Sequence, residues 1–135
     1  MHQTLETIAS EAERNARVAS RLAVSARHLP RVAHFAQVAV GWAGVLRHRA
    51  SGATVSASTD LAEYSDFHDR SKRALAGALA EVMTEQIGSS LNDLSRRNTP
   101  PPLDLLLGRY PADTIEGIPY DTWSAAWSLV REQQD

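Results

Sequence analysis

Apolar residues recur every three or four positions in several long segments of this chain of 135 residues, and no segment alternates convincingly between apolar and polar residues. A period of three to four is typical of amphipathic helices, whereas half-buried strands show a period of two. The clearest stripe runs from Thr4 to His28. It consists mostly of alanine, which lets a neighbouring helix approach closely: Leu5, Ile8, Ala9, Ala12, Ala16, Ala19, Ala23 and Ala26. The spacing predicts an all-α fold.

A second helix is predicted at about Arg31–Arg49, because the segment VAHFAQVAVGWAGVL is apolar on nearly every side. Its fifteen uncharged residues are too few to cross a bilayer, which takes about twenty. We therefore expect a central helix surrounded by others, and no membrane span. Gly41 and Gly44 predict tight contacts with neighbouring helices.

Two further long helices follow in the sequence. The third begins after a capping-box pattern at Asp60 and Glu63 and ends near Gly88, beyond which a short helix can restart. A final helix, with Asp121 as its cap, presents two tryptophans on one face. The sequence thus predicts a compact helical bundle of four main helices plus one or two short ones.

The prolines at 100–102 predict a rigid stop after the helical core. We expect one helical domain over 1–135. Its core covers about 4–97, and a proline-bounded C-terminal arm at about 98–135 packs back on the core or on a partner subunit. Four leucines would pin this arm, and residues 109–120 look irregular: Leu103, Leu105, Leu106 and Leu107.

Composition narrows the possible functions. The chain has no cysteine, which excludes disulfides and thiolate chemistry, and acidic residues near the N-terminus disfavour a signal peptide, so we expect a cytoplasmic protein. Residues 1–50 carry seven Arg and three Glu, whereas residues 51–135 carry seven Lys or Arg and thirteen Asp or Glu. This asymmetry fits a protein partner or packing of one half on the other. With a net charge of −2, nucleic-acid binding is possible but not favoured.

One candidate is a metal-binding site. Glu63, Asp66 and His68 offer carboxylate and imidazole ligands at the short spacing that helical-bundle metal sites use. The favoured interpretation is instead a solvated face, in which Asp66 pairs with Arg70 and Asp69 with Arg73 at four-residue spacing. We expect no cofactor.

A second candidate is catalytic. Arg21 and His28 are separated by six residues, and this Arg-x(4–6)-His spacing resembles that of HEPN-type all-helical ribonucleases. The resemblance implies a metal-independent ribonuclease in which the imidazole acts as acid or base and the guanidinium binds phosphate. Arg27 and His34 have the same spacing, but Pro30 lies between them, so that pair does not share one helix.

The remaining candidates concern binding. His34 and Trp42 on the second helix could border a ligand site in the bundle, although core packing is the alternative for each. The other four candidates lie in the arm: Leu103, Leu106, Trp123 and Trp127. The leading hypothesis is a non-enzymatic protein–protein interaction module, regulatory or inhibitory, acting through an apolar helix surface and forming a homodimer or binding another protein. The alternatives are the ribonuclease and a small-ligand-binding bundle.

Overall fold

A computed structural model describes residues 5–52, 61–94 and 96–133. Four long helices dominate it: α1 (Leu5–Ser25), α2 (Pro30–Gly52), α3 (Leu61–Ile87) and α6 (Tyr120–Gln133). Short elements complete the chain: the 3₁₀ turns η1 (Gly88–Ser90) and η2 (Leu103–Leu106), and the helices α4 (Leu91–Leu94) and α5 (Ala112–Glu116). In this described part there is no strand beyond an isolated bridge between Leu107 and Tyr110. The all-α bundle of four main helices is confirmed.

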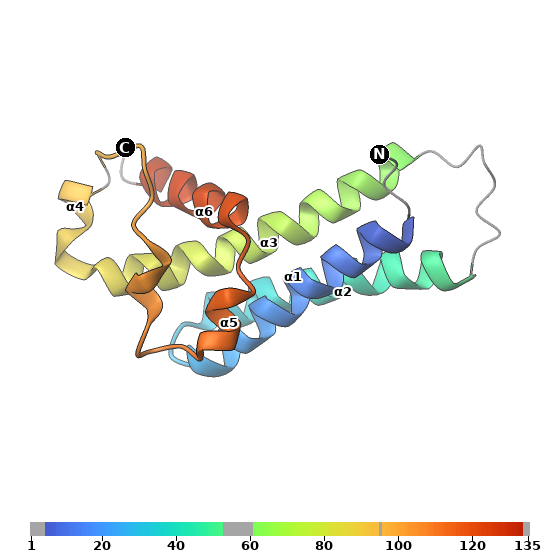
Figure 1. Cartoon of the computed structure of the whole chain (residues 1–135), viewed down its shortest axis with the longest axis horizontal. Helices are drawn as coiled ribbons and strands as arrows, with labels where there is room; N and C mark the ends of the chain where they lie inside the picture. Colours follow the sequence, from blue (N-terminus) through green and yellow to red (C-terminus); the bar gives the residue numbers. More distant parts are fainter. Residues whose placement is uncertain (1–4, 53–60, 95, 134–135) are drawn as a thin grey trace.

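The central helix is α3. Its residues 74–80 are buried without interruption, and it contacts α1, α2 and α6. In Figure 1, α1 and α2 lie along one side of α3 and α6 along the other. The helix ends where Gly88 adopts a φ of 57°, a conformation that favours glycine, as the sequence predicts.

The prediction that α2 is the central helix is wrong. Only one stripe of α2 is buried, against α1 and α3: Val32, Ala36, Ala39, Ala43 and Leu46. On the other side Val40 is 51% exposed, and a Cβ at Gly41 or Gly44 would meet nothing within 4 Å. The reason is that α6 covers α3, so that no described helix covers the outer side of α2.

Helices α1 and α2 form an antiparallel pair through the predicted alanine stripe, in which Ala9, Ala12 and Ala19 are fully buried. Arg47 of α2 ties the open end of the pair. Its Nη1 donates to Glu6 Oε2 at 2.6 Å and its Nη2 to Glu13 Oε1 at 2.5 Å. The hydrogen bond from Arg47 lowers the pKa of the Glu6 carboxyl. Small side chains and this arginine together allow the close pairing.

The C-terminal arm is held by two tryptophans of α6. Trp123 Nε1 donates to the carbonyl oxygen of Pro101 at 2.7 Å, and Trp127 Nε1 donates to that of Arg97 at 2.8 Å. Both indoles are otherwise buried, so each polar N–H is satisfied by the backbone of the proline segment. The arm therefore packs against the core through α6 and the prolines.

The leucines of the arm differ in their roles. Leu106 is fully buried, and Leu103 and Leu105 are partly buried against the core. Leu107 is 55% exposed, so the prediction that it also pins the arm is wrong. Gly108, at a φ of 85°, turns the chain immediately after it.

Two local predictions in the arm are also wrong. Residues 112–116 form helix α5, which begins after Pro111 and lies beside α1, rather than an irregular segment. Proline favours the start of a helix, and burial of Thr114 and Ile115 supplies the packing that five residues need. Helix α6 begins at Tyr120, so Asp121 lies in its first turn instead of capping it. The predicted cap at Asp60 lies outside the described residues.

A candidate binding groove

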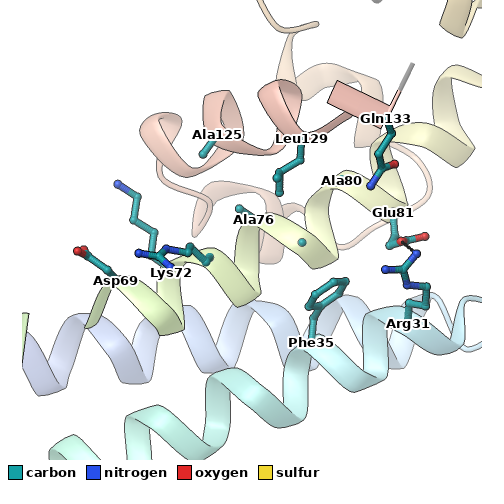
Figure 2. Close-up of a pocket in the computed structure, with 12 residues that line it drawn as sticks. Arg31, Phe35, Asp69, Lys72, Ala76, Ala80, Glu81, Ala125, Leu129 and Gln133 are labelled. Atoms are coloured by element: carbon teal, nitrogen blue, oxygen red, sulfur yellow. Dashed lines mark ion pairs between the residues drawn. The ribbon is translucent and has the colours of Figure 1, made fainter. Parts of the chain in front are cut away.

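An apolar groove lies across α3 between α2 and α6. Its floor is built of small residues of α3, namely Ala76, Gly77 and Ala80. Phe35 of α2 and Leu129 of α6 point toward one another from its two walls (Figure 2). The groove encloses about 530 Å³, which lies within the range of about 300–1,000 Å³ typical of ligand sites. We call this feature the apolar groove.

The shape of the groove depends on one glycine. A Cβ at position 77 would lie 2.6 Å from Cε1 of Phe35, closer than side-chain packing permits. Gly77 therefore lets the Phe35 ring lie directly on the backbone of α3 and form the groove wall. The tight glycine contact predicted for Gly41 and Gly44 occurs instead at this position.

Charged residues border the groove at both ends. At one end, Arg31 Nη1 lies 3.3 Å from Glu81 Oε1, and the guanidinium stands 5.9 Å from the centre of the Phe35 ring. At the other end, Lys72 Nζ donates to Asp121 Oδ2 at 2.6 Å, and this hydrogen bond lowers the pKa of the Asp121 carboxyl. These pairs fix the rim and leave the floor apolar.

A smaller cationic pocket adjoins the groove at the seam between α2 and α3. It encloses about 270 Å³ and shares Phe35 and Arg73 with the apolar groove. Its polar lining comes from His34, Arg70 and Arg73, and its apolar lining from Phe35, Val38, Trp42 and Ala74. We call this feature the cationic pocket.

Trp42 is held in this pocket by α3. Its ring stacks on Phe67 at 5.0 Å between centroids, and the Arg70 guanidinium lies 5.2 Å from its ring centre. Arg70 is fixed in turn, because its Nε donates to Asp66 Oδ2 at 2.8 Å. The predicted pair of Asp66 and Arg70 is confirmed, whereas the predicted pair of Asp69 and Arg73 is not formed.

The six predicted binding residues lie in two different parts of the structure. His34 and Trp42 line the cationic pocket together. Trp123, Trp127 and Leu106 are buried in the core, and Leu103 packs at its edge. The four arm residues therefore hold the fold together and do not border the groove or the pocket.

The two residues of the ribonuclease resemblance contact different elements. Arg21 Nη1 lies 3.5 Å from Asp113 Oδ2 of α5, and His28 Nε2 lies 2.5 Å from Glu85 Oε2 of α3. Glu85 also affects Tyr110: burial raises the pKa of the Tyr110 hydroxyl, and the charge of the Glu85 carboxylate raises that pKa further. Each member of the Arg21 and His28 pair is thus matched with a carboxylate on another helix.

The proposed metal ligands also diverge. Asp66 turns to Arg70, whereas His68 Nε2 lies 2.8 Å from Glu11 Oε2 of α1, a close contact without hydrogen-bond geometry. The side chain of Glu63 lies outside the described side chains. Over 5–52, 61–94 and 96–133, no group of three or more His, Asp or Glu residues is placed to hold a metal ion. No helix in those ranges is long and apolar enough to cross a membrane.

Phe35, Gly77 and Arg73 line the groove but are not among the binding residues predicted from the sequence. The available signal was Gly77, a glycine in the middle of the apolar run ALAGALA, which suits a close approach by a bulky side chain. No protein-family model, curated protein or solved structure matches this chain.

Proposed function

We propose that this protein is a non-enzymatic interaction module whose apolar groove receives an amphipathic helix of another protein. The observation that supports the proposal is the groove itself, a trough with a floor of small residues between α2 and α6. Helix-in-groove binding uses this arrangement, in which an apolar helix face inserts its side chains between flanking elements.

The length of the trough favours a helical occupant. Its α3 lining residues recur at one-turn intervals from Asp69 to Glu81. Twelve steps along a helix span about 18 Å, or roughly three turns. A partner helix lying along α3 would present apolar residues at i, i+3 or i+4, and i+7 over the same distance. Because the floor is alanine and glycine, the matching partner side chains are large.

The groove walls supply the apolar contact. Phe35 and Leu129 are partly buried in the free chain, and both pack against the core. Both side chains line the trough, so a bulky partner residue inserted between them removes apolar surface from water on both walls. Aromatic and aliphatic anchors of this kind dominate binding energy at helix interfaces.

Site-specific photo-crosslinking tests the proposal. A photoreactive amino acid replaces Gln133, which lines the groove at the end of α6, and in a control it replaces Ser128, which is exposed on α6 outside the groove lining. Material captured in the cells of origin is digested, and the linked segment is identified by mass spectrometry. We expect position 133 alone to capture a segment of another protein with an amphipathic helical pattern.

A blocking variant makes the test specific to the groove. Ala125→Trp fills the trough from α6, whereas Ser128→Trp adds the same side chain outside it. We expect the first variant to abolish capture at position 133 and the second to preserve it. Equal capture at both positions, capture unaffected by Ala125→Trp, or a link only to a second copy of this chain would each refute the partner-helix proposal.

A further inference from the structure

The cationic pocket holds an unusual excess of positive charge for its size. Three basic side chains line it, and none of its lining residues is a carboxylate. Arg73, which stands between this pocket and the apolar groove, is exposed and has no ion pair within the described ranges. An arginine guanidinium offers five N–H donors, so this side chain has full capacity for an external acceptor.

Among the described side chains, no carboxylate lies within ion-pair distance of Arg73. Among the described carboxylates around the groove and the pocket, Asp66 pairs with Arg70, Glu81 with Arg31 and Asp121 with Lys72, whereas Asp69 is exposed and lies 3.8 Å from a ring nitrogen of His68. Arginine and carboxylate pair by charge-assisted, often bidentate hydrogen bonds. The exposed Arg73 guanidinium is therefore available to an external acceptor.

The charge balance of the pocket selects the kind of anion. Arg70 and Arg73 supply two positive charges, and Asp66 offsets one of them through its bond to Arg70 Nε. One positive charge remains, beside the imidazole of His34. A singly charged carboxylate matches this balance better than a doubly charged phosphate.

We infer that the cationic pocket receives an aspartate or glutamate side chain of the same partner helix that occupies the apolar groove. This inference rests on the proposed function and adds the chemistry of the partner. The two sites adjoin at Phe35 and Arg73, so one helix lying across Phe35 can contact both. Arg70 precedes Gly77 by seven residues on α3, which places the acidic residue about 10 Å, or two turns, from the centre of the apolar contact.

A pair of fluorescent probes tests the anion site separately from the groove. The anionic probe is 8-anilinonaphthalene-1-sulfonate, and N-phenyl-1-naphthylamine has the same aromatic body without the sulfonate. Both are titrated against the native chain, Arg73→Gln, Ala125→Trp and the control Arg17→Gln, an exposed arginine of α1 that lines neither site. Circular dichroism melting shows that each variant remains folded.

The inference predicts that Arg73→Gln weakens binding of the anionic probe about ten-fold, the effect of losing one charged hydrogen bond. Binding of the neutral probe should be unchanged. Ala125→Trp should weaken binding of both probes, and Arg17→Gln should change the binding of neither. If Arg73→Gln affects both probes equally or neither, the anion inference fails while the groove stands. If Ala125→Trp affects neither probe, the proposed function fails as well.

Photo-crosslinking at position 133 identifies the source of the anion. Arg73→Gln should reduce capture of the partner segment, and that segment should carry an acidic residue. Capture that is unchanged by Arg73→Gln, together with weaker binding of the anionic probe, would assign the pocket to a free amphiphilic anion and overturn the side-chain assignment.

Discussion

Replacement of Gly77 by alanine tests the packing that shapes the groove. Alanine favours a helix interior over glycine by about 1 kcal/mol, so the change is stabilising where space permits. At position 77 the new Cβ would lie 2.6 Å from Phe35 Cε1, and the ring must move. Overpacking of this kind costs about 1–3 kcal/mol. We expect a net loss of up to about 2 kcal/mol in the free energy of unfolding when the gain and the cost are combined.

The same substitution in α2 provides the control. A Cβ at Gly41 or Gly44 meets nothing within 4 Å, so Gly41→Ala and Gly44→Ala should each raise the free energy of unfolding by about 0.5–1 kcal/mol. Urea denaturation measures all three variants, and Phe35→Leu in the Gly77→Ala background should recover part of the loss. If Gly77→Ala stabilised the chain as the α2 variants do, the account of the groove wall would be wrong.

Three further predictions concern the arm and the rim. Trp127→Phe leaves a backbone carbonyl without its indole donor and should lower the free energy of unfolding by about 1–3 kcal/mol in urea titration, which an unchanged midpoint would contradict. Leu103→Ala with Leu106→Ala should lower the melting temperature, mostly through the fully buried Leu106, because truncating a buried leucine costs about 2–5 kcal/mol. Lys72→Met removes the partner that lowers the pKa of the Asp121 carboxyl. That stabilisation is present above the ordinary pKa of 3.8 and is lost as pH falls through the lowered pKa of the folded state, so native and variant melting temperatures should differ at pH 7 and converge when the pH falls below that lowered pKa.

The helices themselves were predictable because local sequence specifies them. The alanine stripe of α1 faces α2 and α3, while Arg14 and Arg17 remain exposed. A period of three to four residues with charges on the opposite side determines both the helix and its buried face. The end of α3 at Gly88 follows equally from a residue that tolerates positive φ.

The arrangement of the helices depends on contacts that sequence spacing does not reveal. Trp123 and Trp127 satisfy their indole N–H groups with carbonyls 22 and 30 residues earlier in the chain. The groove requires Phe35 to meet Gly77 across 42 positions. Sequence spacing does not show these partners. The tryptophans are therefore predicted as candidate ligand contacts, and Phe35 is not predicted to have a specific role. The cationic pocket arises in the same way, from α2 and α3 residues brought together only by the fold.

The wrong prediction that α2 is the central helix has a more general physical cause. The segment is apolar by residue type, yet much of it is alanine and glycine, whose side chains carry little apolar area. Burial is driven by area removed from water, at about 25 cal/mol per Å², rather than by the number of apolar residues. Val40 and Val45 are the large hydrophobic residues of α2 that remain exposed, and the two glycines near them add no side-chain area. Because its exposed large hydrophobic residues are these two valines, this face offers little apolar area toward the roughly 800 Å² that a standard interface buries on each partner. The homodimer prediction therefore requires surface beyond α2, and light scattering at micromolar concentration tests it directly, with a clean monomer as the refuting result.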